Sequence, residues 1–140
     1  MRVMFCGCNK LTALDLTPLS TSNVTDMYGM FEDCGGLTSL DLTPLDTTNV
    51  TNMKRMFSGC YNLTSLNLSS LNTSNVTSMD SMFYSCYELT SLSIGDKFAF
   101  VGSDYQLHSG TWYASNGTAY TSNGTTCTIP NNKADTYTRR

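Results

Sequence analysis

Four cysteines stand 26 residues apart, and thiols repeated in this way could do three kinds of chemistry. If the chain stacks with this period, neighbouring thiols come within reach of a disulfide, or they pack as small buried apolar groups. Zinc needs a tetrahedral ligand set, which neither a straight ladder nor C-x2-C spacing supplies here. We favour buried free thiols and keep vertical disulfides as the alternative. The four are Cys8, Cys34, Cys60 and Cys86.

Acid–base and nucleophilic chemistry has few residues to use. His108 is the only histidine, so a Ser-His-Asp or Cys-His device has a single possible base. No nucleophile-elbow motif stands near it. Cys6 lies outside the cysteine column, and we expect it to be exposed and open to intermolecular oxidation. The sequence therefore predicts a protein that is not an enzyme, with no catalytic residue, cofactor or metal.

Binding chemistry would have to use residues that stand between the repeated apolar positions. Asp15 above Asp41 could hold a cation weakly, but two carboxylates fall short of the roughly six to eight oxygens that calcium prefers. A merely solvated polar face, or tyrosines that only shield a loop, are the alternatives. The candidate binding residues are Asp15, Ser39, Asp41, Ser65, Asn67, Tyr61, Tyr87 and Trp112.

A repeat of 26 residues must position all of these side chains. Its copies are residues 4–29, 30–55, 56–81 and a shortened 82–95. The same residue types recur in columns of Met, Phe, Cys, Leu and Asn. A fixed period in the twenties is typical of a solenoid, in which each coil buries its apolar side on its neighbours.

Within one copy, the apolar spacing changes from a strand pattern to a helix pattern. Residues 37–42 alternate, which predicts a short strand with Leu40 and Leu42 facing inward. Pro44 ends the strand because it has no N–H to donate. Apolar residues within 50–60 then step by three, three, one and three, which predicts a helix of two to three turns capped by Asn49. Each coil is thus expected to contain a strand and a short helix.

The two ends of the array carry separate expectations. Met1 lies in register but partway through a repeat, so we expect a fragment without a capping repeat. The first coil should then expose part of four apolar residues and invite end-on self-association. These residues are Phe5, Leu14, Leu16 and Val24.

The last 45 residues leave the repeat. Residues 97–101 are predicted to form a strand that follows the array. Asn-Gly pairs at 116–117 and 123–124 favour tight hairpin turns and predict a three-stranded antiparallel meander that caps the last coil. Its aromatic residues could alternatively bind sugar. Residues 131–140 are polar and are predicted to fray or to lead into a further domain.

Composition excludes several classes of protein. The 140 residues include 14% charged residues, and the net charge is −3 with eight Lys and Arg in total. Nucleic-acid binding needs clustered positive charge, so we exclude it. No apolar run approaches the roughly 20 residues of a membrane span, so membrane insertion is not expected. No charged-then-apolar signal peptide opens the sequence, so we expect a cytosolic protein, a processed one or a fragment.

The column motifs resemble those of a known family. L-T-S-L-D-L, T-S-N-V-T-D-M and M-F-x-x-C, at a 26-residue period over residues 1–95, are similar to the leucine-rich repeats of bacterial surface proteins of the BspA-like and mycoplasma type. The segment after residue 95 is similar to the one that often follows such arrays. One departure is that Leu19, Leu45 and Leu71 stand where the usual pattern has Asn or Cys. The resemblance implies an extracellular, cell-wall-associated protein with a role in adhesion, and it offers no catalytic residues to transfer.

The sequence therefore leads to one expected fold and one preferred function. The fold is an α/β repeat, a leucine-rich-repeat solenoid of about four coils over residues 1–95, closed by an antiparallel β cap and polar tail over 96–140. The function is a non-enzymatic cell-surface interaction module of a longer secreted protein, which contacts a host or neighbouring-cell protein or glycan. The alternatives are a structural spacer, or a carbohydrate-binding module that uses Trp112, Tyr113 and Tyr120.

Overall fold

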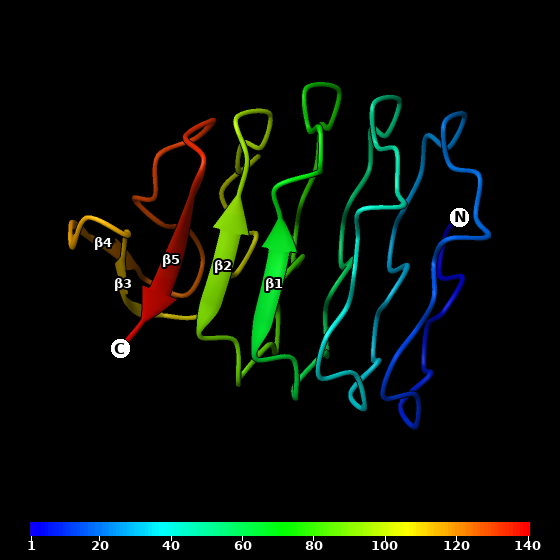
Figure 1. Cartoon of the computed structure of the whole chain (residues 1–140), viewed down its shortest axis with the longest axis horizontal. Helices are drawn as coiled ribbons and strands as arrows, with labels where there is room; N and C mark the ends of the chain where they lie inside the picture. Colours follow the sequence, from blue (N-terminus) through cyan, green and yellow to red (C-terminus); the bar gives the residue numbers. More distant parts are fainter.

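The computed structural model describes all 140 residues as a row of flattened coils that ends in a small sheet (Figure 1). The fold is all-β. One mixed sheet has the strand order β1-β2-β5-β3-β4, in which only the β1–β2 pair is parallel. The strands are β1 (Ser65–Leu68), β2 (Ser91–Ile94), β3 (Gly110–Tyr113), β4 (Ala119–Ser122) and β5 (Asp135–Arg139).

The predicted α/β solenoid with helices is wrong, because the structure contains no helix. An α-helix bonds each N–H to the carbonyl four residues earlier. Here the N–H of Phe57 donates instead to the carbonyl of Met82 in the next coil, at 3.0 Å. The N–H of Met56 donates three residues back, to Met53, at 3.3 Å. The backbone N–H groups that an α-helix would use therefore donate either to a neighbouring coil or within a local turn.

This alternation of bonds explains why the sequence pattern looked helical. Along residues 55–60, the N–H of every second residue donates to the carbonyl three residues back and closes a turn, and the other N–H groups donate to the adjacent coil. Successive three-residue turns bring apolar side chains to one side with a period close to that of a helix. The apolar spacing within 50–60 therefore marks a series of turns.

Two positions in each coil adopt a left-handed backbone, which lets the chain pass from one turn to the next. Gly59 has φ of 78°, and a Cβ there would lie 3.1 Å from Cα of Asp33 in the preceding coil. Ser85 occupies the same column one coil later, with φ of 60°. Gly29 and Arg55 share the other column, with φ of 57° and 55°. An α-helix cannot accommodate residues in this region, because they reverse its hand.

The predicted helix cap has a different role. The side-chain amide of Asn49 donates to the carbonyl of Ser22 at 2.7 Å, and that of Asn75 donates to Thr48 at 2.7 Å. Both bonds span 27 residues and join one coil to the one before it. The asparagine column is therefore a ladder between coils rather than a set of caps.

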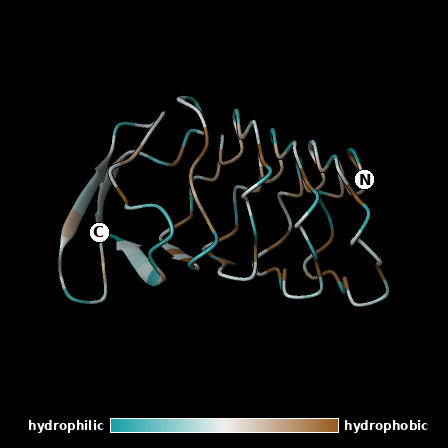
Figure 2. Cartoon of the chain, turned by 90° about the horizontal axis from the view of Figure 1, so that it is seen from above, coloured by the Kyte–Doolittle hydropathy of each residue, from teal (hydrophilic) through white to brown (hydrophobic).

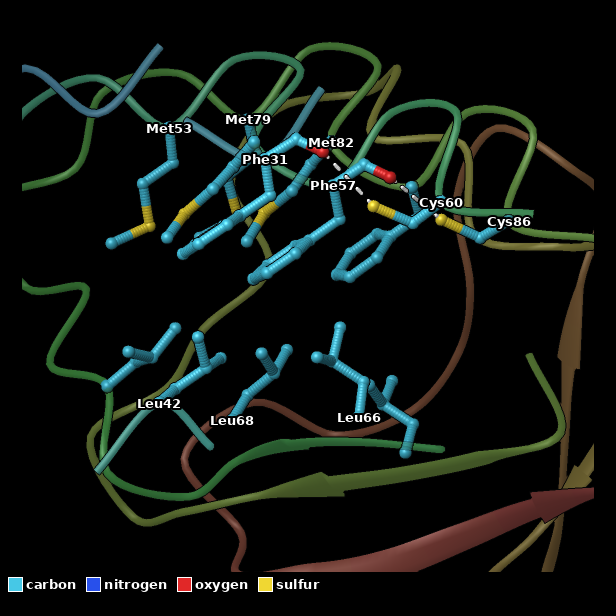
Figure 3. Packing of buried hydrophobic residues seen from close by; sticks show 14 of the residues in the cluster. Phe31, Leu42, Met53, Phe57, Cys60, Leu66, Leu68, Met79, Met82 and Cys86 are labelled. Carbon is cyan, nitrogen blue, oxygen red and sulfur yellow. Dashed lines mark hydrogen bonds between the residues drawn. The ribbon is translucent and has the colours of Figure 1, made fainter. Parts of the chain in front are cut away.

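The core lies inside the coils, between a layer of leucines and a layer of phenylalanine, methionine and cysteine (Figure 3). Apolar residues recur at the same place in successive coils (Figure 2). Leu40 and Leu42 are buried while Asp41 is exposed, so the predicted alternation is confirmed. Within the repeats, paired strands form only between β1 and β2, next to β5, and residues 39–42 keep the alternation without forming a strand.

The C-terminal segment confirms one predicted hairpin and corrects the rest. β3 and β4 pair antiparallel across the turn that contains Asn116 and Gly117. The second Asn-Gly turn is flanked by a single bridge between Ser122 and Cys127, and residues 97–101 form no strand. The tail that was predicted to fray contains β5, which lies between β2 and β3. Its Tyr137 is completely buried, and this anchors the end of the chain to the core.

The first coil is more covered than expected. Leu16 is buried in the core, so its predicted exposure is wrong, and Phe5, Leu14 and Val24 are half-buried. Leu16 faces inward like Leu42 in the next coil. The exposed apolar residues of this coil are Val3, Met4 and Leu11. End-on self-association through this coil stays a prediction. The structure contains no helix with the length and apolar character that a membrane crossing requires.

Candidate functional site

The carboxylates proposed for cation binding are engaged in turns of their own coil. Oδ1 of Asp15 accepts from the N–H and the hydroxyl of Thr17 at 2.9 and 2.7 Å. Oδ1 of Asp41 accepts from the same groups of Thr43 at the same distances. The N–H of Thr17, followed by its hydroxyl, lowers the pKa of Asp15. The hydroxyl of Thr43, followed by its N–H, lowers the pKa of Asp41. Both carboxylates therefore fix corners of the coils.

Asn67 completes this column, and its Oδ1 accepts from the N–H of Ser69 at 3.0 Å. Ser39 and Ser65 are exposed beside it. We call Asp15, Ser39, Asp41, Ser65 and Asn67 the polar face. Neither cavity of the structure is lined by any of them. No group of three or more His, Cys, Asp or Glu is arranged to hold a metal ion.

The cysteine column forms hydrogen bonds between coils. All six thiols are free, and three are buried, so the hypothesis of buried free thiols is confirmed for Cys34, Cys60 and Cys86. Cys8 is half-buried, and Cys6 is exposed as predicted. Each buried Sγ donates to a phenylalanine carbonyl of the preceding coil, and Figure 3 shows these bonds for Cys60 and Cys86. The distances are 3.0 Å for Cys34 to Phe5, 3.2 Å for Cys60 to Phe31 and 3.1 Å for Cys86 to Phe57.

Burial of these thiols makes the stability of the fold depend on pH. It raises the pKa of Cys34 to about 11 and that of Cys86 to about 12, and it raises the pKa of Cys60 as well. Thiols in the unfolded chain ionise near pH 8.5. Above that pH the unfolded state binds fewer protons than the folded state, so the free energy of unfolding falls as pH rises.

We therefore expect Cys86→Ala to flatten this pH dependence. Between pH 9 and 11 a single buried thiol contributes up to about 1.4 kcal/mol per pH unit. Urea unfolding of wild type and Cys86→Ala at several pH values measures the two slopes. Cys6→Ala is the control and should flatten the dependence less, because Cys6 is exposed, although desolvation and the nearby Glu32 and Asp33 raise the pKa of its thiol as well. Equal slopes for wild type and Cys86→Ala would contradict the burial of an un-ionised thiol.

Three exposed tyrosines gather on the last two coils. Tyr61 and Tyr87 share a column, and their side chains are 41% and 57% exposed. Tyr84, three residues before Tyr87, is 48% exposed. The ring of Tyr61 lies over Gly35, where an added Cβ would overlap it. We call Tyr61, Tyr84 and Tyr87 the tyrosine patch.

A cavity of about 210 Å3 opens beside this patch. Phe83 and Cys86, both buried, form part of its lining, and Tyr84 and Tyr87 line it from the exposed side. Most of the remaining wall comes from the segment before β3, namely Gln106, His108 and Ser109. Ser85 of the last coil and Gly124 after β4 complete the lining. Sequence reasoning missed Gln106 as a site residue, because this segment has neither a repeat nor a periodic pattern to indicate which side chains face the array.

The structure places Trp112 in the core rather than on a binding surface. Its side chain is completely buried, and its Nε1 donates to the carbonyl of His108 at 3.2 Å. Tyr113 is half-buried under the guanidinium of Arg140, and Tyr120 packs edge-on against Tyr137. Trp112 fills the interior because it faces inward on β3, as its burial pattern shows. The aromatic residues of the hairpin therefore do not form an open sugar-binding face.

Fold and site together define a class: a helix-free repeat protein with an aromatic pocket between its last coil and its C-terminal sheet. Residues 1–100 match the family described as "Mycoplasma protein of unknown function, DUF285". The chain belongs to this family, which confirms the mycoplasma part of the resemblance. That description does not speak of leucine-rich repeats, so that part stays a prediction. No curated protein and no solved structure matches the chain.

Proposed function

We propose that this protein is a non-enzymatic interaction module of a mycoplasma-type, BspA-like surface protein. It contacts a protein or glycan partner through the tyrosine patch and the adjoining cavity. The observation that carries the proposal is that three tyrosines on the last two coils remain 41–57% exposed, and that two of them, Tyr84 and Tyr87, line the same cavity. Exposed aromatic side chains lower solubility, and where several of them form a patch, the patch often marks an interaction site.

The tyrosine patch has the composition of a binding surface, whereas the polar face does not. Tyrosine is among the residues that dominate binding energy at protein interfaces. The polar face has no Tyr, Trp or Arg, and its Asp15 and Asp41 are committed to turns. These observations support the patch as the contact surface and the remaining coils as its support.

The backbone beneath the patch is well fixed, which favours binding without a large loss of conformational entropy. The N–H of Gly59 donates to the carbonyl of Tyr84 at 2.8 Å, which ties one coil to the next. The Nη2 of Arg139 on β5 donates to the carbonyl of Tyr87 at 3.1 Å. The loop that holds the tyrosines is thus attached to the array on one side and to the C-terminal sheet on the other.

Two further features support the non-enzymatic and surface assignments. His108 is the one histidine, and no carboxylate lines the cavity with it. The chain has only 14% charged residues and relies on Ser, Thr and Asn for its polar surface, a composition common in secreted and surface proteins. A structural spacer is the second candidate, and the polar face, whose side chains bind their own backbone, favours it.

Binding of fluorescent protein to host cells, to matrix proteins and to a glycan array tests the proposal. We expect Tyr84→Ser and Tyr87→Ser each to weaken binding about tenfold or more, as loss of a central aromatic contact does. Ser39→Ala and Ser65→Ala on the polar face are the matched controls and should bind like wild type. If the wild-type protein bound to no host cell, matrix protein or glycan, the proposal would be overturned and the structural spacer favoured.

A further inference from the structure

We infer that the cavity beside Tyr84 is a subsite for one neutral sugar ring, such as a terminal hexose or N-acetylhexosamine of a glycan. This inference rests on the proposed function and names the class of ligand that the same site takes. It differs from the sugar-binding hairpin expected from the sequence, because Trp112 is buried and the cavity is lined by coil residues instead.

The size of the cavity limits the ligand. Its volume of about 210 Å3 is smaller than the roughly 300–1,000 Å3 of pockets that take drug-sized ligands. A ligand of one ring therefore fits, and a longer chain would have to continue outward past the exposed tyrosines.

The charge of the cavity indicates a neutral ligand. None of its nine lining residues is Asp, Glu, Lys or Arg. A phosphate or carboxylate ligand would call for arginine or lysine, and an amine would call for a carboxylate. Phe83, Tyr84, Cys86 and Tyr87 supply apolar surface, on which the C–H face of a sugar ring can pack. Aromatic side chains serve this purpose well because they offer a large rigid area.

The polar groups of the cavity suit hydroxyls. The Nε2 of Gln106 donates to Oδ1 of Asp104 at 3.0 Å, which fixes the amide and leaves its Oε1 as an acceptor. The Nδ1 of His108 lies 2.9 Å from the carbonyl of Ser109. Because a carbonyl only accepts, this contact calls for a proton on Nδ1, and Nε2 can then accept whenever the ring is neutral. Sugar hydroxyls can donate to both acceptors.

Hydrogen bonds to the last coil and to the C-terminal segment fix the wall that carries Gln106 and His108. The N–H of Phe83 donates to the carbonyl of Tyr105 at 3.1 Å, which joins this wall to the last coil. The N–H of Gln106 donates to the carbonyl of Thr125 at 3.0 Å, and the hydroxyl of Ser122 donates to the carbonyl of Leu107 at 2.7 Å. A cavity formed by such bonds needs little rearrangement to accept a small ligand.

Saturation-transfer NMR with methyl glycosides of glucose, galactose, mannose, N-acetylglucosamine and N-acetylgalactosamine tests the inference on the full chain. We expect at least one to bind with a Kd on the order of 1 mM, which is typical of a small contact area. Tyr84→Ser and Gln106→Asn should each weaken this binding about tenfold. Asparagine is chosen at position 106 because it keeps an amide and tolerates the left-handed backbone, φ of 59°.

Ser65→Ala is the control, because Ser65 is exposed on the polar face and does not line the cavity. It should leave monosaccharide binding unchanged. Absence of transfer from every glycoside, or equal transfer in wild type, Tyr84→Ser and Gln106→Asn, would overturn the inference. If the wild-type protein nevertheless binds a macromolecular partner through the tyrosine patch, the proposed function is supported and only the sugar subsite is wrong.

Discussion

Phe57→Ala is expected to lower the free energy of unfolding by about 3–5 kcal/mol, the range for removing a large aromatic side chain from a core. Phe57 is completely buried. Its ring stacks on Phe31 with centroids 5.7 Å apart and an interplanar angle of 5°, and on Phe83 at 6.2 Å and 13°. Alanine would leave a cavity between two coils and remove both ring contacts (Figure 3). Urea unfolding followed by tryptophan fluorescence measures the loss.

Phe5→Ala is the matched control for this prediction. Phe5 belongs to the same column, but it has one stacking neighbour, Phe31 at 5.8 Å, and it is half-buried. Less apolar surface returns to water when it is removed, so its loss of stability should be clearly smaller. Equal losses for the two variants would mean that the phenylalanine column does not hold the coils together as described.

Thr47→Val is expected to cost about 2–4 kcal/mol although the two side chains have the same shape. Thr47 is only 2% exposed, and its hydroxyl bridges two coils. It donates to the carbonyl of Asn72 at 2.9 Å and accepts from the N–H of Asn72 at 2.9 Å. Valine satisfies neither backbone group of Asn72, and even a partly buried group is costly to leave without a partner.

Thr47→Ser separates the hydroxyl from the methyl group of this side chain. Serine keeps both hydrogen bonds and removes only one methyl, so its expected cost is about 1 kcal/mol. The equivalent bridge one coil earlier, from Thr21 to Asp46 at 3.0 and 2.7 Å, shows that the device repeats. If valine proved as stable as serine at position 47, the threonine column would contribute packing alone.

The repeat made the core predictable and the backbone path unpredictable. Identical residue types at a fixed period placed Met, Phe, Cys and Leu in columns, and burial of Phe57, Cys60 and Leu66 agrees with this. The predicted helix was wrong because turns that repeat every three residues give an apolar spacing close to the 3.6-residue period of an α-helix. The left-handed positions that distinguish the two are not marked by glycine in every coil. Arg55 and Ser81 adopt them without any sequence signal.

Part of the candidate site was readable from sequence and part was not. Tyr61 and Tyr87 were expected at the surface, since they fall in a column that the apolar pattern leaves outside, and both are exposed. Asp15 and Asp41 carried a readable signal that was overlooked, because Asp-x-Thr is the spacing of a turn closed by a side chain. Trp112 lies outside the repeat, where no second copy shows which face is buried.

The hydrogen-bond partner of the Phe57 N–H tests the helix-free stack most directly. An NMR experiment that detects scalar coupling across hydrogen bonds identifies the carbonyl that this group contacts. The structure predicts coupling to the carbonyl of Met82 in the next coil, at a donor–acceptor distance of 3.0 Å. Coupling to the carbonyl of Met53, four residues back, would show an α-helix and contradict the structure on which the site rests.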